Sequence, residues 1–278
     1  MHNKTSDISQ YIHGSSPKEH HRLSLLNELL NKACLQELNI SGGEKILDVG
    51  SGLGQFTRMM AQATGESGVV VGVERDIQQI AQAKELAKEA KELDLVEFRQ
   101  GNALSLPLKD NEWGSFNLAH SRFLLEHLSH PAEAISQMVS SVRPGGRIFI
   151  SDDDHEHFCP WPEPPGFHAL WHAYMRSYDR LGNDPYIGRR LVFLLHDSGL
   201  KFIRNTSVFF GGCAGNERFD AVSDNLIGVI EGAKETILSN ELLDSESYSN
   251  AIDGLKRWKN SPSAALWYTV CCAEGTVS

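Results

Sequence analysis

The sequence predicts an α/β protein built on a seven-stranded, mostly parallel β-sheet. Short segments rich in valine, isoleucine and leucine alternate with amphipathic helical segments along the chain. A glycine-rich turn, residues 50–54 (GSGLG), directly follows the first apolar segment. Alternating strands and helices form parallel sheets, because each helix carries the chain back to the edge where the next strand begins. We therefore expect a ligand at the carboxyl edge of the strands.

The first half of the chain supplies five of the expected strands. Before them, leucines at helical intervals predict a helix over residues 17–38. The strands are expected at residues 45–49, 69–74, 96–100, 116–120 and 147–151, and the helices between them at 56–63, 77–92 and 131–142. Glu and Lys at helical spacing indicate that the helix over residues 77–92 is exposed.

Two insertions interrupt the alternation in the second half. A helix over residues 188–198 and strands over 201–210 and 266–273 complete the expected sheet. Around the sixth strand, residues 152–185 and 212–262 form helical insertions, the first with clustered prolines and aromatics and the second polar. We expect residues 1–40 to form a lid helix, and residues 41–278 to form one domain whose insertions cap the substrate.

The composition limits the partners of the protein. Lys and Arg total 26 against 36 Asp and Glu, a net charge of −10, and no basic cluster is present to neutralise phosphates. Nucleic acid is therefore not expected as a partner. Five scattered cysteines without a C-x-x-C pair fit a reducing compartment. Without a signal-peptide core or an apolar run long enough to span a membrane, we expect a cytoplasmic monomer or homodimer.

The glycine turn argues for a nucleoside cofactor other than a nicotinamide dinucleotide. The dinucleotide fingerprint requires a small residue at position 55 or 57, where this sequence has Gln55 and Thr57. Glu74 ends the second expected strand, where a carboxylate accepts hydrogen bonds from ribose hydroxyls. An ordinary tight turn between strand and helix is the alternative, which the position of Glu74 makes less favourable.

Several ordered motifs resemble those of class I methyltransferases. Residues 46–54 (ILDVGSGLG) resemble motif I and residues 71–74 (VGVE) resemble motif II. Residues 101–107 (GNALSLP), 125–128 (LEHL) and 142–146 (VRPGG) are similar to later landmarks of the family. The resemblance covers residues 46–151 and is nearest to the ubiquinone/menaquinone and small-molecule branch. It implies a Rossmann-like fold, S-adenosyl-L-methionine as cofactor and S-adenosyl-L-homocysteine as product.

The same resemblance implies which residues bind the cofactor. The glycine turn would lie beside the methionine part, Glu74 would bind the ribose hydroxyls, and Arg75 would lie beside the adenine. Asn102 and Ala103 would bind the adenine amino edge, although the family usually has Asp at the first position. The full expected set is Tyr11, Arg22, Asp48, Gly50, Ser51, Gly52, Glu74, Arg75, Asn102, Ala103 and His120.

Some members of this set have a second interpretation. Tyr11 and Arg22 belong to a segment that resembles a lid over the cofactor, where they would hold the methionine carboxylate; the alternative is a solvated helix start. Asp48 either fixes the turn or binds the cofactor amino group, and a purely structural acid is the alternative. His120 would serve the cofactor through its backbone alone, or take part in catalysis.

Methyl transfer from a sulfonium needs mainly alignment and exclusion of water. A hydroxyl or carbon acceptor also needs a base, and the candidates are His120, expected to end the fourth strand, and His155 with Asp154 or Asp153 as partner. Alternation in an extended segment places Asp153 and His155 on one side and Asp152 and Asp154 on the other. We therefore expect proton transfer without a metal, with a solvated loop or a metal site as alternatives.

The function expected from the sequence is methyl transfer to a small-molecule acceptor. A protein or RNA methyltransferase is the first alternative, but the acidic balance and the lack of an N-P-P-Y motif argue against a nucleic-acid substrate. A non-catalytic S-adenosylmethionine-binding domain is the second. An aromatic series forms either the core of the first insertion or a substrate cage: Phe158, Trp161, Phe167, Trp171, Tyr174 and Tyr178.

Overall fold

The computed structural model describes residues 30–179 and 182–278. Of the helix expected over residues 17–38, residues 30–38 are described and are helical. Tyr11, Arg22 and most of the expected lid lie outside the described residues. None of the helices in the described ranges is long and apolar enough to cross a membrane.

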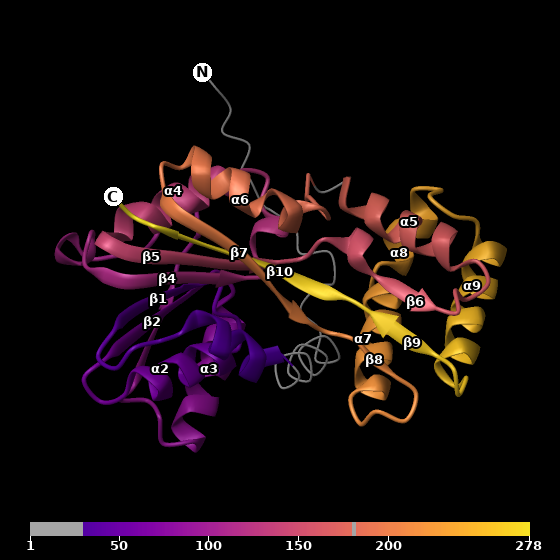
Figure 1. Cartoon of the computed structure of the whole chain (residues 1–278), viewed down its shortest axis with the longest axis horizontal. Helices are drawn as coiled ribbons and strands as arrows, with labels where there is room; N and C mark the ends of the chain where they lie inside the picture. Colours follow the sequence, from indigo (N-terminus) through magenta and orange to yellow (C-terminus); the bar gives the residue numbers. More distant parts are fainter. Residues whose placement is uncertain (1–29, 180–181) are drawn as a thin grey trace.

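A seven-stranded sheet with the order β3-β2-β1-β4-β5-β10-β7 forms the core (Figure 1). Its strands are β1 (Lys45–Val49), β2 (Val69–Glu74), β3 (Val96–Gln100), β4 (Phe116–Arg122), β5 (Val142–Asp152), β7 (Lys201–Phe209) and β10 (Thr269–Thr276). The pairs from β3 to β5 are parallel, and β10 runs antiparallel to both β5 and β7. The expected seven-stranded, mostly parallel sheet is confirmed.

Helices cover both faces of this sheet. They are α2 (Gln55–Thr64) and α3 (Ile77–Glu89) on one face, and α4 (Pro131–Ser141) and α6 (Ile187–Asp197) on the other (Figure 1). Successive strand residues point to opposite faces, so Ile46 packs with Phe56 and Met60 of α2, whereas Leu47 packs with the α4 and α6 side chains. Both faces are therefore apolar, as parallel strands require.

The two insertions fold together into one unit, here called the helical lobe (residues 159–179 and 212–267). It contains α5 (Phe167–Asp179), α7 (Phe219–Gly232), α8 (Lys234–Ser239), α9 (Ser245–Lys259) and the small sheet of β6 (Cys159–Trp161), β9 (Ala265–Trp267) and β8 (Gly212–Cys213). Figure 1 shows these helices together at one end of the molecule. The second insertion is helical, as expected, and its helix α7 buries Phe219, Val222 and Leu226 on one side.

Several strand boundaries differ from the expectation, and β5 begins at Val142, five residues before the expected position. β4 continues to Arg122, so His120 lies inside the strand and does not end it. The segment expected as one strand over residues 266–273 is divided between β9 and β10, and the chain passes from the small sheet to the large one at Tyr268. The apolar run continues across this point, so periodicity alone gives no sign of the change of sheet.

Candidate active site

The glycine turn after β1 lies against the end of β2. Gly50, Gly52 and Gly54 have φ values of 79°, 54° and 70° in the left-handed region, which favours glycine. Gly50 N and Ser51 N both donate to Val73 O, at 2.8 and 3.0 Å. A Cβ at Gly54 would come within 2.4 Å of the Phe98 ring, so this position also has no room for a side chain.

Glu74 is held beside this turn with its carboxylate ready for a further donor. Its Oε2 accepts from Gly52 N at 3.1 Å, and its Oε1 accepts from the backbone N–H groups of Arg75 and Asp76 at 2.8 and 2.9 Å. Two carboxylate oxygens offer about four acceptor positions, so capacity remains for ribose hydroxyls. A carboxylate fixed against a glycine turn fits the nucleoside part of S-adenosylmethionine.

Asp48 and His120 form a buried pair beneath the turn. His120 Nδ1 lies 2.8 Å from Asp48 Oδ1, and Asp48 Oδ2 accepts from Thr57 Oγ1 at 2.6 Å. Both residues are buried, and the His120 ring packs 5.0 Å from that of Phe56. These two contacts join Asp48 to α2 and β4, and with 3% of its surface exposed it has little access to a cofactor amino group; that second role stays a prediction. The same burial argues against the expected catalytic role of His120.

The other residues expected to bind the cofactor differ in how accessible their side chains are to a ligand. Asn102 is exposed, but its Oδ1 accepts from Leu104 N at 3.0 Å, so the amide oxygen is turned to its own loop and not outward to an adenine. The Ser51 side chain packs against β2, 3.0 Å from where a Cβ at Gly72 would lie. Ser51 therefore has only its backbone to offer to a ligand. Arg75 is exposed and Ala103 is half-buried, both at the expected edge.

A short chain of contacts joins the glycine turn to the end of β5. Leu124 Cδ1 lies 3.2 Å from where a Cβ at Gly50 would be. The next residue, Leu125, donates its N–H to Asp152 Oδ2 at 2.8 Å. Leu125 begins the 3-10 turn Leu125–His127, and a second such turn, His155–His157, follows β5. The loops after β1, β4 and β5 therefore meet at one edge of the sheet.

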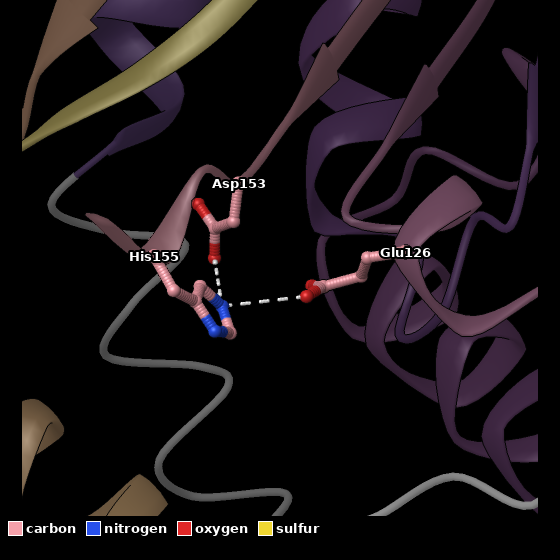
Figure 2. Close-up of side chains that lie close together, drawn as sticks. All are labelled: Glu126, Asp153 and His155. Atoms are coloured by element: carbon pink, nitrogen blue, oxygen red, sulfur yellow. Dashed lines mark ion pairs between the residues drawn. The ribbon is translucent and has the colours of Figure 1, made fainter. Parts of the chain in front are cut away.

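Glu126, Asp153 and His155 lie close together at this edge and are here called the His155 cluster (Figure 2). His155 Nε2 is 3.4 Å from Glu126 Oε2 and 3.6 Å from Asp153 Oδ2. His155 and Glu126 are each 3% exposed. The sequence indicated that Asp153 and His155 share a side, but it did not single out Glu126, which belongs to the loop after β4. No local spacing could have found Glu126, because the contact joins loops of neighbouring strands.

Aromatic side chains surround the His155 cluster. Trp171 Nε1 donates to His155 O at 2.7 Å, and the rings of Tyr174 and Tyr178 lie 5.5 and 5.0 Å from that of His155. Tyr268, at the change of sheet, donates its hydroxyl to Asp153 Oδ1. Trp161, from the same expected series, is 64% exposed and lies elsewhere on the helical lobe.

The charges of the cluster oppose the base role expected for His155. Burial alone would lower the pKa of His155, but the carboxylates of Asp153 and Glu126 raise it to about 9. Burial would raise the pKa of Glu126, yet the charges of His127 and His155 hold it below its usual range. At neutral pH His155 is therefore a cation between two carboxylates. This arrangement argues against the expected base role, because a cationic imidazole has no free lone pair to accept a proton; the role itself stays a prediction.

Asp154 takes no part in this cluster. Its carboxylate forms a two-pronged ion pair with Arg189 of α6, with Nη2 donating at 2.7 Å, and it caps the turn by accepting from Glu156 N at 3.2 Å. It points away from His155 because alternate residues of an extended segment face opposite sides. Of the two partners expected for His155, Asp153 is in place and Asp154 is not.

The Rossmann-like sheet, together with the glycine turn and Glu74 at its carboxyl edge, defines a class I S-adenosylmethionine-dependent methyltransferase. In agreement, the model of the methyltransferase domain family matches residues 40–180, half of the chain. The chain belongs to this family. The family and the Rossmann-like fold expected from the sequence are confirmed.

Relatives by sequence include two proteins named as methyltransferases. The demethylmenaquinone methyltransferase of Desulfitobacterium hafniense is 23% identical over 240 residues, which cover 82% of this chain and 91% of that protein. The O-methyltransferase resE of Aspergillus sclerotiorum is 26% identical over 208 residues, which cover 73% of this chain and 74% of that protein. An uncharacterised 37.1 kDa protein in transposon TN4556 of Streptomyces fradiae is 28% identical over 76% of this chain, which spans 59% of its length.

Solved structures share the fold at low identity. The [4+2]-cyclase SpnF has a TM-score of 0.56 at 18% identity, with 90% of this chain and 80% of that one covered. A SAM-dependent methyltransferase from Aquifex aeolicus has a TM-score of 0.52 at 20% identity, with 69% and 91% covered. Since these two neighbours are named for different reactions, the fold does not by itself define the reaction.

Proposed function

We propose that this chain transfers a methyl group from S-adenosylmethionine to a small-molecule acceptor bound beside the His155 cluster. The observation that carries the proposal is the contact chain from Gly50 through Leu124 and Leu125 to Asp152, which joins the glycine turn to the end of β5. The segment after β5 contacts the aromatic wall, our name for Phe158, Trp171, Tyr174 and Tyr268. The relatives named as demethylmenaquinone methyltransferase and O-methyltransferase support a small acceptor.

The cofactor, when bound, supplies a methyl group already activated on a sulfonium. We assign the ribose hydroxyls to Glu74, whose carboxylate keeps acceptor capacity beside the turn. The backbone of residues 50–54 would face the methionine part, and Arg75 and Ala103 would border the adenine. The amide nitrogen of Asn102, whose oxygen accepts from Leu104 N, would be the atom left to contact the adenine. Tyr11 and Arg22 stay predictions for the methionine carboxylate.

The acceptor side needs orientation more than an attacking group. Trp171 and Tyr174 present flat, buried surfaces from α5, and Phe158 stacks on Tyr268 with ring centroids 3.7 Å apart. Such a wall excludes water and holds a planar or apolar acceptor in line with the methyl group. The segments expected as a cap thus supply the surface that we assign to the acceptor.

Transfer of a labelled methyl group to an extract of small metabolites tests the proposal. The protein should label a low-molecular-weight product, because its site is enclosed by buried aromatic side chains and its charge does not favour nucleic acid. A parallel reaction contains protein and RNA from the same cells. Label in protein or RNA alone would support the first alternative, and cofactor binding without any transfer would support a non-catalytic domain.

Conservative changes in the aromatic wall should affect the acceptor more than the cofactor. Trp171→Phe removes one of the two hydrogen bonds to His155 O and leaves the longer one from Phe158 N at 3.3 Å, at a cost of about 0.5–1.5 kcal/mol. We expect the acceptor KM to rise by roughly 2- to 12-fold, with the Kd of S-adenosylmethionine nearly unchanged. Trp161→Phe, on the exposed side of the helical lobe, is the matched control. A larger effect on the cofactor than on the acceptor would refute the assignment.

A further inference from the structure

The three side chains of the His155 cluster present a nitrogen and two carboxylate oxygens to a common point. One ligand-type atom from each of Glu126, Asp153 and His155 lies within 4.8 Å of the other two. Figure 2 shows that the side chains converge from the two loops that follow β4 and β5. The position of each donor is therefore set by the end of a strand of the central sheet.

The spacing of these atoms fits coordination. Two ligands placed about 2.1 Å from a tetrahedral ion are about 3.4 Å apart. The His155 Nε2 distances are 3.4 Å to Glu126 Oε2 and 3.6 Å to Asp153 Oδ2. They exceed the usual length of a hydrogen bond between an imidazolium and a carboxylate. The same three atoms thus suit an ion between them better than a direct proton-mediated contact.

A second observation concerns Glu126 itself. Its Oε2 is buried and, within the described part of the chain, makes no hydrogen bond of good geometry, although its residue is 97% removed from solvent. A carboxylate oxygen left in this state is costly unless a cation compensates it. The imidazole nitrogens nearest to this carboxylate are His155 Nε2, 3.4 Å from Glu126 Oε2, and His127 Nε2, 3.5 Å from Glu126 Oε1.

We propose that the His155 cluster is a binding site for a divalent transition-metal ion. His155 Nε2, Glu126 Oε2 and Asp153 Oδ2 are the three protein ligands, and the fourth position is open to water or to an oxygen of the acceptor. On binding, the proton of His155 Nε2 leaves to solvent and the ion takes its place, so the two carboxylates balance the 2+ charge. Asp153, with 18% of its side chain exposed, marks the side from which the ion enters.

The donor set selects the kind of ion. One imidazole and two carboxylates suit Zn²⁺, Mn²⁺ or Fe²⁺, whereas Mg²⁺ prefers oxygen ligands in an octahedral shell that keeps several waters. Tyr268, which donates to Asp153 Oδ1, holds that carboxylate with its other oxygen toward the cluster. The sequence predicts that residues 152–157 work without a metal, because alternation prevents this segment from presenting all its ligands on one side. Glu126 completes a set that this segment cannot form by itself.

Metal binding to the full chain, without cofactor or acceptor, tests the proposal. After dialysis against a chelator, titration calorimetry with Zn²⁺ and Mn²⁺ should show one site per chain, Mg²⁺ should bind much more weakly, and Co²⁺ should give the intense visible absorption of a four-coordinate ion. Glu126→Gln and Asp153→Asn should each weaken Zn²⁺ binding by more than about 100-fold. His157→Gln, a neighbouring histidine with 44% of its side chain exposed, should leave that site intact.

The outcomes separate this proposal from the function proposed above. Absence of one-to-one binding of Zn²⁺, Mn²⁺ or Co²⁺ to the unmodified protein overturns the metal site and identifies the cluster as an ion set with a protonated His155. Binding that persists in both carboxamide variants places the metal elsewhere and also overturns it. Because methyl transfer plays no part in these measurements, a failure of the labelling assay does not affect their result. Circular dichroism of each variant checks that the fold is retained.

Discussion

Replacing Glu74 by alanine is expected to weaken S-adenosylmethionine binding by about 1.5–3 kcal/mol, the contribution of one charged hydrogen bond to the ribose. The loss is therefore roughly 10- to 150-fold in Kd. The effect is large because the carboxylate is held in place by three backbone N–H groups and makes charge-assisted hydrogen bonds. Calorimetric titration of the cofactor measures the loss directly.

Two matched variants make this result specific. Glu74→Gln keeps the shape of the side chain and removes its charge, so it should retain part of the affinity. Glu85→Ala removes an acid from the exposed side of α3, where 68% of its side chain is accessible, and should leave the Kd unchanged. Cofactor affinity that survives in Glu74→Ala, or tight binding of NADH by the unmodified chain, would contradict the assignment of the edge to S-adenosylmethionine.

The central sheet could be predicted from local sequence because each of its strands has a local signature. The strands over residues 45–49, 69–74 and 96–100 have the expected bounds, since short apolar runs bounded by glycine and polar residues are typical of buried parallel strands. The glycine turn and Glu74 followed from the same local pattern. Such features depend on neighbouring residues in the sequence, so a single amino-acid sequence is sufficient to predict them.

The helical lobe could not be predicted in the same way. In its small sheet, β9 pairs with β6 of the first insertion and with β8, which lie about a hundred and about fifty residues earlier in the chain. No periodicity marks those pairings, because partners in a sheet may be any distance apart in sequence. Prediction from local pattern therefore gave the helices of the lobe but not the way in which the two insertions combine.

The candidate site shows the same division. Alternation correctly put Asp153 and His155 on one side of their segment, because that property is local. It could not show Glu126, which arrives from another loop, nor the charge of His155, which depends on two carboxylates and on burial together. The charges around His155 argue against its expected role as a base, and the sequence could not show them, since a pKa is set by the surroundings of the folded chain.

Raising the pH is expected to destabilise the metal-free protein through His155. Its pKa is 6.5 in ordinary surroundings and about 9 in the folded chain, mainly because Asp153 and Glu126 outweigh the effect of burial. The folded state therefore holds this proton more tightly than the unfolded state does. The stabilisation is fully present below pH 6.5 and is lost as the pH rises through about 9. It amounts to about 3 kcal/mol in the free energy of unfolding.

Urea unfolding across this pH range, in the presence of a chelator, measures the loss, and His155→Gln is the control. Glutamine fills much of the same space and does not titrate, so its free energy of unfolding should be lower near pH 6.5 and should change much less up to pH 9. Glu126 affects the free energy of unfolding only at acid pH, because its pKa is lowered in the folded chain. Its stabilisation is present above about pH 4.5 and is lost as the pH falls below that value. Parallel pH profiles for the two proteins would show that His155 carries no bound proton in the folded chain, and the charge assignment of the cluster would then be wrong.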